Sequence, residues 1–245
     1  MSKDSVAIAW CDSGMVDGKF AHGISDVMLK SGVTFGTSLR SQGNQIARQR
    51  QVLIDYWYEK TDYEWLFWVD SDVVINPEKF RLLWDNKDEK ERPLLTGVYF
   101  TTDNPEDPLM IPMPTLFNFA TQEDGSIGVT RVHPLPDNQL IKVDAAGMGF
   151  VLMHRSIYPK LKEIAPEGQI FREMGYGSKF IGEDIFFFAL CEKADIPLYC
   201  HTGATAPHMK RFSFDEHYYK AFFGDLKQES KIIKPKNAGK IIVPK

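Results

Sequence analysis

The sequence predicts an α/β fold in which a mixed, mainly parallel β-sheet is flanked by helices. Over residues 1–100, short apolar segments alternate with amphipathic ones. This alternation is typical of parallel strands that are joined by right-handed helical crossovers. In addition, the segment 66–74 begins with an unbroken apolar run and continues into two carboxylates, as expected for a strand that is buried on both faces of a sheet.

Local signals place the elements of the first half. Asn76 and Pro77 are an N-cap and a first-turn residue of a helix, and Gly32 is placed to end an earlier helix. The stretch 45–60 carries an apolar stripe typical of an amphipathic helix, formed by Ile46, Val52, Leu53, Tyr56 and Trp57. We expect strands at 6–10, 33–39, 66–74 and 94–100, and helices at 22–30, 45–60 and 77–86.

The second half is less regular. Prolines are dense in the segment 101–116, which we expect to be a long loop. The segment 214–226 is amphipathic and aromatic. The tail 227–245 contains six lysines, which favours a solvated end, with contact to an acidic partner as the alternative. We expect strands at 116–120, 128–133, 140–144, 149–154 and 197–201, and helices at 156–164 and 183–194.

Composition narrows the class of protein. The chain has 245 residues, of which 43% are hydrophobic, and a formal net charge of -4, so a sizeable core is expected and no global basic field favours nucleic acid. Three cysteines without a CxxC pattern indicate free thiols in a reducing compartment. No run approaches the ~18 apolar residues of a membrane span, and the apolar segment 6–10 is too short for a signal peptide. We therefore expect a cytoplasmic protein whose membrane contacts are at most peripheral.

Asp70 and Asp72 are the strongest candidates for chemistry. In a strand they point the same way, with Ser71 opposite. Two like charges at the end of a buried strand are costly unless a positive group lies beside them. A hard divalent cation with oxygen ligands, shared with a diphosphate, is the natural candidate. The alternative is a solvated turn, but the apolar residues that follow argue against an open one.

Three polar side chains precede or begin the helix at 45–60. Arg40 closes the second strand, whereas Asn44 and Arg48 are spaced four residues apart and share a helix face. A helix N-terminus beside a guanidinium favours a bound anion. The alternative is a solvated basic helix face that includes Arg48 and Arg50.

Two further segments carry titratable groups. Asp184 follows Glu183 at the start of an apolar helix and is a candidate general base, with helix capping as the alternative. His208 follows a strand, in a loop with Lys210 and Arg211. Its imidazole can complete a metal shell, and the two cations can hold phosphate. His201 is a weaker competitor of His208.

The segment 143–150 is rich in small residues. Gly147 and its neighbours permit close approach of the backbone to a ligand, and Asp144 presents a carboxylate at a strand end. A tight turn with a bulge explains the same residues equally well.

In chain order, these motifs resemble the GT-A family of nucleotide-sugar glycosyltransferases. The resemblance extends over most of residues 5–210 and rests on the Asn44/Arg48 helix, on Asp70-Ser71-Asp72 with the strand before it, on the segment 143–155, on Gly182-Glu183-Asp184 and on His208. It implies that Asp70 and Asp72 bind Mn²⁺ or Mg²⁺, with Asp72 as the favoured direct ligand. It also implies that Asp184 is the base of an inverting transfer, that His208 completes the metal site, and that the glycine-rich segment approaches donor and acceptor.

The resemblance also implies a domain plan. Residues 1–226 would form a single catalytic domain, with a nucleotide-binding half at 1–100 and an acceptor half at 101–226. Trp10 and Asp12 are placed to contact the nucleotide base, although the first strand lacks a familiar base signature. The acceptor, a glycan, a protein or a modified nucleobase, stays open, and the loops 105–114 and 212–223 are candidates for its recognition.

Other classes of function compete with this interpretation. A sugar-phosphate nucleotidyltransferase needs a glycine-rich loop with a basic residue after the first strand, and residues 11–20 contain only Gly14 and Gly18. A binding module would take nucleotide sugars or carbohydrates without turnover. A nucleic-acid-associated protein would use the lysine tail, and this does not exclude a transferase that acts on modified DNA bases.

Overall fold

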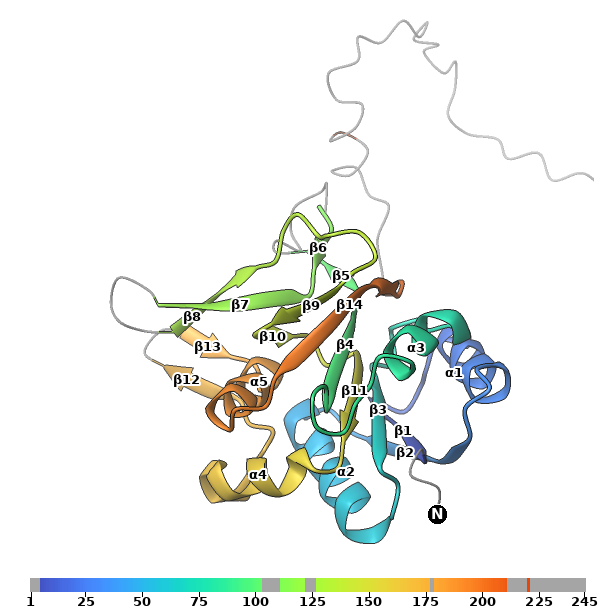
Figure 1. Cartoon of the computed structure of the whole chain (residues 1–245), viewed down its shortest axis with the longest axis horizontal. Helices are drawn as coiled ribbons and strands as arrows, with labels where there is room; N and C mark the ends of the chain where they lie inside the picture. Colours follow the sequence, from blue (N-terminus) through green and yellow to red (C-terminus); the bar gives the residue numbers. More distant parts are fainter. Residues whose placement is uncertain (1–4, 103–110, 122–126, 177–178, 211–219, 221–245) are drawn as a thin grey trace, which may run out of the picture.

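The computed structural model describes residues 5–102, 111–121, 127–176, 179–210 and 220 (Figure 1). Every strand and helix that was predicted in the first half is present, with ends that differ by a few residues. The largest difference is the aspartate-ending strand, which stops at Val69 rather than at residue 74. The elements are β1 (Val6–Asp12), α1 (Gly18–Lys30), β2 (Phe35–Gln42), α2 (Ile46–Lys60), β3 (Trp65–Val69), α3 (Pro77–Trp84), β4 (Leu94–Val98) and β5 (Phe100–Thr101).

The second half contains the predicted helices and several short strands. A hairpin just before α5 was not predicted, because its three-residue strands are too short to give a periodic signal. The elements are β6 (Met113–Pro114), β7 (Leu116–Thr121), β8 (Ile127–Arg131), β9 (Leu140–Val143), β10 (Ala145–Ala146), β11 (Phe150–His154), α4 (Ile157–Ile164), the hairpin strands β12 (Met174–Tyr176) and β13 (Lys179–Ile181), α5 (Glu183–Lys193) and β14 (Leu198–Thr205).

A seven-stranded sheet in the order β2-β1-β3-β11-β4-β14-β9 organises the molecule. Strands β2, β1, β3, β4 and β14 run in one direction, whereas β11 and β9 are antiparallel to their neighbours. The predicted α/β class with a mainly parallel mixed sheet is therefore confirmed. The carboxyl ends of β1, β2 and β3 meet at one edge of the sheet, where ligands of such folds bind.

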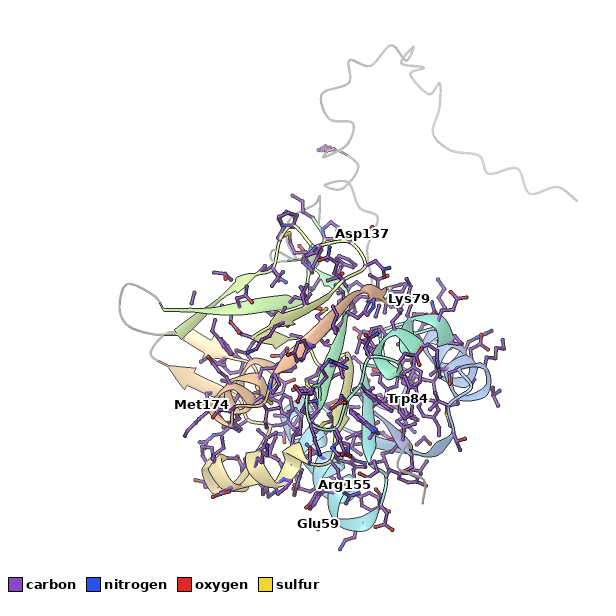
Figure 2. All side chains as sticks on the ribbon, viewed as in Figure 1. Glu59, Lys79, Trp84, Asp137, Arg155 and Met174 are labelled. Carbon is purple, nitrogen blue, oxygen red and sulfur yellow. The ribbon has the colours of Figure 1, made fainter. Side chains whose placement is uncertain are left out.

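Helices cover both faces of this sheet. Helices α1 and α3 pack on one face, and α2, α4 and α5 pack on the other (Figure 1). Successive residues of β3 alternate between the two cores, so Phe67 faces α1 and α3 whereas Trp68 faces α2 and α5. Complete burial of Phe67 contributes about 1.5–3 kcal/mol. Side chains fill the space between the sheet and the helices on both faces of the sheet (Figure 2). Trp84, the last residue of α3, is one of them.

Helix α2 buries part of the predicted apolar stripe, Leu53 and Trp57, but not all of it. Val52 and Tyr56 are 54% and 52% exposed. The buried stripe instead follows the spacing of Leu53 and Trp57 back to the start of the helix, and it includes Arg50. At the C-terminus of α2, Arg155 donates hydrogen bonds to the carbonyl oxygens of residues 58, 61 and 63. These bonds fix the path of the chain as it leaves the helix.

Some predictions lie outside the described residues. These are the structure of most of the loop 105–114, the segments 212–223 and 214–226, the tail 227–245 and Arg211. In the part of the chain that is described, no helix combines the length and apolar character that crossing a membrane requires. The three cysteines are free and buried, as predicted, whereas the cytoplasmic location stays a prediction.

Candidate functional site

Asp70, Ser71 and Asp72 form a turn at the carboxyl end of β3. The amide of Val73 donates to the carbonyl oxygen of Asp70 at 2.9 Å, which closes a β-turn. The prediction that Asp70 and Asp72 share one face of a strand, with Ser71 opposite, is therefore wrong. The chain leaves the sheet after Val69 because β11, which pairs with β3, begins its ladder only at that position. All three residues nevertheless line one cavity.

Backbone pairing brings the segment after β14 to this turn. Val73 and His208 form an isolated antiparallel bridge. As a result, His208 Nε2 lies 3.1 Å from Asp72 Oδ2, and Lys210 Nζ donates to the same oxygen at 3.0 Å. His208 Nδ1 lies 2.8 Å from the carbonyl oxygen of Phe100. Because a carbonyl only accepts, Nδ1 carries a proton, and because the carboxylate of Asp72 also only accepts, Nε2 donates to it. A metal ion held by Asp72 and His208 would take the place of the Nε2 proton.

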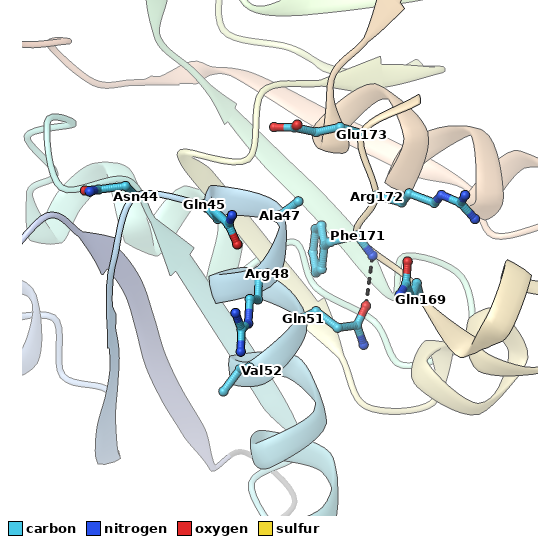
Figure 3. A pocket seen from close by; sticks show the side chains of 10 residues that line it. All are labelled: Asn44, Gln45, Ala47, Arg48, Gln51, Val52, Gln169, Phe171, Arg172 and Glu173. Atoms are coloured by element: carbon cyan, nitrogen blue, oxygen red, sulfur yellow. Dashed lines mark hydrogen bonds between the residues drawn. The ribbon is translucent and has the colours of Figure 1, made fainter. Parts of the chain in front are cut away.

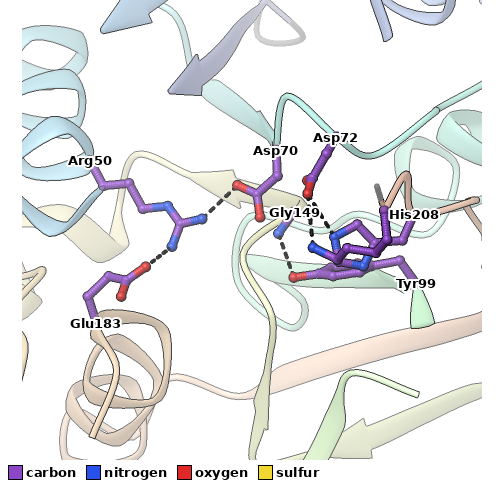
Figure 4. A network of polar contacts seen from close by, with 8 residues as sticks. Arg50, Asp70, Asp72, Tyr99, Gly149, Glu183 and His208 are labelled. Atoms are coloured by element: carbon purple, nitrogen blue, oxygen red, sulfur yellow. Dashed lines mark hydrogen bonds and ion pairs between the residues drawn. The ribbon is translucent and has the colours of Figure 1, made fainter. Parts of the chain in front are cut away.

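Arg50 joins the turn to the start of α5 (Figure 4). Its side chain is only 5% exposed. Nη2 donates to Asp70 Oδ1 at 2.6 Å, and Nη1 donates to Glu183 Oε1. Burial alone would lower the pKa of Arg50, but the charges of Asp70 and Glu183 outweigh it and raise the pKa. The guanidinium therefore stays charged and fixes both carboxylates.

These residues surround a cavity of about 330 Å³ at the carboxyl edge of the sheet. Four carboxylates line it, whereas the nearby positive groups are the guanidinium of Arg50 and the Lys210 and His208 side chains that contact Asp72, so negative side chains outnumber positive ones. An excess of negative charge of this kind favours a bound cation. The lining residues are Cys11, Ile46, Arg50, Asp70, Ser71, Asp72, Glu183 and Asp184.

The donor set fits one class of metal ion. Among the described residues, no group of three or more His, Cys, Asp or Glu side chains could hold a metal by itself. Asp72 and His208 supply one oxygen and one nitrogen ligand side by side. Mg²⁺ is often bound through one or two carboxylates together with substrate phosphates and water, and Asp72 supplies one such carboxylate. The residues therefore fit a cation whose coordination is completed by a diphosphate.

The carboxylates of the cavity differ in basicity. Burial raises the pKa of Asp184, and the charge of Arg50 offsets this only in part. Burial also acts on Asp72, but the hydrogen bonds and charges of His208 and Lys210 outweigh it and lower the pKa of Asp72. Asp184 is thus the better proton acceptor and Asp72 the more persistent anion, a division that suits a base beside a metal ligand.

Gly147 lets the ring of Tyr99 pack against the backbone of the site. A Cβ atom at Gly147 would lie 2.0 Å from Tyr99 Oη and 2.7 Å from its Cζ. At Gly149, a Cβ atom would lie 2.9 Å from Asp70 Oδ2. The small residues predicted to let a ligand approach therefore make room for Tyr99 and Asp70, and Asp144 accepts a hydrogen bond from the amide of Phe119.

Replacement of Gly147 by alanine is expected to destabilise the fold by about 1–3 kcal/mol, because the new methyl group overlaps the buried ring of Tyr99. Thermal unfolding measures this effect. Gly18→Ala is the matched control, because nothing lies within 4 Å of a Cβ atom there. Equal melting temperatures for the two variants would contradict the contact with Tyr99.

Trp10, Asp12 and Arg40 form a separate cluster at the ends of β1 and β2. Asp12 accepts from Arg40 Nε and Nη2 at 2.6 and 2.8 Å, from Trp10 Nε1 at 3.1 Å and from the amide of Gly14 at 2.7 Å. The hydrogen bond from Arg40 is the main reason why the pKa of Asp12 is lowered. The structure thus pairs Arg40 with Asp12, whereas the sequence analysis assigned both to ligand contacts.

Asn44 and Arg48 do not face the carboxylates. They line two adjoining cavities along the outer side of α2 (Figure 3). Arg50, which the sequence analysis grouped with the solvated alternative, is the arginine that reaches Asp70 and Glu183. Its position, three residues before the buried Leu53, was the signal that could have identified it.

Tyr99 was missed as well. It is 7% exposed, and burial, with Asp70 nearby, raises its pKa well above the usual value. It packs edge-on against His208, with ring centroids 4.9 Å apart. No pattern in the sequence marks this residue, because its contacts come from segments far apart in the chain.

Comparison with known proteins gives only distant similarities. No family model matches the chain, and no curated protein matches its sequence. The crystal structure of A197 from STIV has a TM-score of 0.48 and 19% identity, covering 84% of this chain and 86% of that one. The crystal structure of GalNAc-T7 with UDP, GalNAc and Mn²⁺ has a TM-score of 0.48 and 9% identity, covering 85% of this chain and 44% of that one.

A third structure, CMP:2-keto-3-deoxy-manno-octonic acid synthetase complexed with CTP, has a TM-score of 0.46 and 12% identity, covering 90% of this chain and 97% of that one. The chain thus spans less than half the length of the GalNAc-T7 chain but most of the other two. At identities of 9–19%, these similarities assign no activity to the protein.

Proposed function

We propose that this protein is a metal-dependent glycosyltransferase of the GT-A type, which transfers a sugar from a nucleotide-sugar donor to an acceptor hydroxyl with inversion. One observation carries the proposal. The turn after β3, the segment after β14 and the start of α5 bring Asp72, His208 and Asp184 to one edge of the sheet. This set combines a metal-ligand pair with a carboxylate of raised pKa.

The donor would occupy the side of the cavity that Asp72 and His208 face. These two residues would hold Mn²⁺ or Mg²⁺, which when bound stabilises negative charge on the leaving nucleoside diphosphate. Lys210 Nζ donates a hydrogen bond to Asp72 Oδ2, the oxygen that His208 also contacts. Lys210 would contact the diphosphate. Residues 1–100 would supply most of the donor site, and residues 101–226 would supply Asp184, which acts on the acceptor.

Asp184 would act on the acceptor. Its raised pKa favours removal of a proton from the attacking hydroxyl. Arg50 holds the neighbouring Glu183 and Asp70 in place, which keeps the start of α5 beside the turn. The hydroxyl oxygen then forms its bond to the anomeric carbon as the bond to the diphosphate breaks on the opposite face.

A donor screen tests this proposal. With Mn²⁺, the full-length protein is expected to bind one of a panel of nucleotide sugars and to release nucleoside diphosphate slowly. Asp72→Asn is expected to remove the metal-dependent part of donor binding, measured by calorimetry with Mn²⁺ or with EDTA. Asp62→Asn is the matched control, because Asp62 is exposed and precedes β3 at the other end of the strand.

Three outcomes would contradict the proposal. Tight donor binding without release of nucleoside diphosphate, also with acceptors present, would indicate a binding module. Release of pyrophosphate from a nucleoside triphosphate and a sugar phosphate would indicate a nucleotidyltransferase. Unchanged metal dependence in Asp72→Asn would remove Asp72 from the metal site.

A further inference from the structure

A groove on the outer side of α2 has no role in the chemistry described above. It consists of two adjoining cavities of about 520 and 530 Å³, which share Asn44, Gln45, Arg48 and Val52. Figure 3 shows the lining of the first. One cavity begins at the carboxyl end of β2, and the other extends to the segment 169–173. We call this continuous feature the α2 groove, lined among others by Gln42, Asn44, Gln45, Arg48, Gln169 and Arg172.

Six polar side chains of the α2 groove are not used by the fold. Within the described part of the chain, the six side chains just named have no hydrogen bond or ion pair. By contrast, Gln51 in the same wall is fully engaged, because its Oε1 accepts from the amides of Ile170 and Phe171. Gln49, which also lines the groove, donates to the carbonyl oxygens of Asp12 and Ser41. Gln49 and Gln51 therefore have structural roles, and the amides of Gln42, Asn44, Gln45 and Gln169 are available to a ligand.

The α2 groove lies next to the reaction cavity. Ile46 and Arg50 line the cavity that contains Asp184, whereas Ala47 and Gln51, the residues that directly follow them, line the groove. Successive helical residues point about 100° apart, so the two sites occupy adjacent sides of the same two turns. A chain bound in the groove can therefore reach the cavity across the N-terminal turns of α2.

We propose that the α2 groove binds the acceptor and that this acceptor is a hydroxyl-rich oligosaccharide. The inference rests on the proposed function, since only a transferase needs an acceptor. Each amide offers two donors and one carbonyl acceptor on one side chain, which matches sugar hydroxyls that both donate and accept. Val52, 54% exposed in the groove wall, provides apolar surface for the C–H faces of the sugar rings.

Charge argues against a nucleic acid in the groove. Among the residues that the structure describes, two cations line the groove, Arg48 and Arg172, and Glu173 opposes them. This is too little for the several phosphate contacts that nucleic-acid affinity requires. The two guanidinium groups also point in different directions (Figure 3), so they do not form a clamp on one phosphate. Protein interfaces are enriched in aromatic anchors, whereas within the described part of the chain the one aromatic residue that lines the groove, Phe171, is buried.

Binding of defined tetrasaccharides to the full-length protein tests this inference. The probes are tetrasaccharides of glucose, mannose, galactose and N-acetylglucosamine in α and β linkages, followed by saturation-transfer NMR. At least one is expected to bind, and the double variant Gln45→Ala/Gln169→Ala is expected to weaken it about tenfold, as the loss of two hydrogen bonds predicts. Gln139→Ala is the matched control, exposed and remote from the groove on the segment before β9.

The readouts separate this inference from the proposed function. Release of nucleoside diphosphate from the donor is expected to be unchanged in the double variant. Binding of none of the tetrasaccharides, or equal binding by the wild type and the double variant, would overturn the α2 groove as an acceptor site. Binding that depends on the groove, in a protein without any donor turnover, would overturn the transferase and with it the assignment of the bound sugar as an acceptor.

Discussion

Asp184→Asn is expected to lower turnover by ~10²–10⁴-fold, the range that general-base catalysis contributes. Asparagine keeps the shape of the side chain but cannot accept a proton from the acceptor hydroxyl. Donor binding should stay intact, because Asp72 and His208 are not altered. Initial rates of nucleoside diphosphate release, together with calorimetric donor binding, measure the two effects separately.

The raised pKa of Asp184 gives this prediction a second readout. Burial raises the pKa of the Asp184 carboxyl group in the folded state, so the folded protein is favoured at low pH, where this group is protonated. That contribution to stability is lost as the pH rises through the folded-state pKa. At neutral pH the ionised carboxylate therefore destabilises the fold, and the neutral asparagine should leave the melting temperature equal or higher.

A pH profile and a control complete the test of Asp184. The acidic limb of the wild-type profile should lie above the ordinary aspartate value of about 3.9. Asp195→Asn, which is exposed just beyond the other end of α5, should keep full turnover. Asp195 has a φ of 54°, a conformation that asparagine also adopts. A turnover loss in Asp195→Asn equal to that in Asp184→Asn would contradict the role of Asp184 as base.

Arg50→Met is expected to lower the free energy of unfolding by about 3–5 kcal/mol, because it leaves the carboxylates of Asp70 and Glu183 without their shared partner. For a chain of this length, the melting temperature should fall by roughly 6–20 °C. Urea unfolding at neutral pH measures the change in free energy directly.

The same helix supplies the control for Arg50. Arg48→Met removes an exposed guanidinium that has no partner within the described residues, so it should change stability by no more than about 0.5 kcal/mol. Adding Glu183→Gln to Arg50→Met should recover part of the loss, because a buried charge is removed. The deficit should also shrink at low pH, since burial raises the pKa of Glu183 and its protonated form needs no guanidinium. Similar unfolding curves for Arg48→Met and Arg50→Met would rule out the buried ion pair.

Much of the fold could be predicted from the sequence because strand and helix signals are local. The apolar run before Asp70 and the cap at Asn76 each depend on a few neighbouring residues. The antiparallel placement of β11 between β3 and β4 could not be predicted, because periodicity identifies a strand but not its direction or its neighbours. The turn at residues 70–72 was predicted as strand for a related reason. The residue at which β3 ends depends on its pairing with β11, which the sequence does not reveal.

The residues of the candidate site also differ in whether a local signal in the sequence marks them. Asp70, Asp72 and Asp184 carry charge beside apolar runs, so they stand out in the sequence, and the structure brings them to one cavity. Arg50 and Asn44 were misjudged because the face of a helix that is buried depends on what packs against it. Val52 and Tyr56 are exposed, so the buried face of α2 is centred on Leu53 and includes Arg50.

The central position of β11 has a consequence for how the chain acquires its structure. This strand comes from the second half of the sequence but lies between two strands of the first. Until residue 154 has been synthesised, the facing edges of β3 and β4 have no partner, and such open edges invite pairing with other chains. The segment 1–100 is therefore not an autonomous folding unit, and during translation the emerging chain depends on late-arriving residues to complete its central sheet.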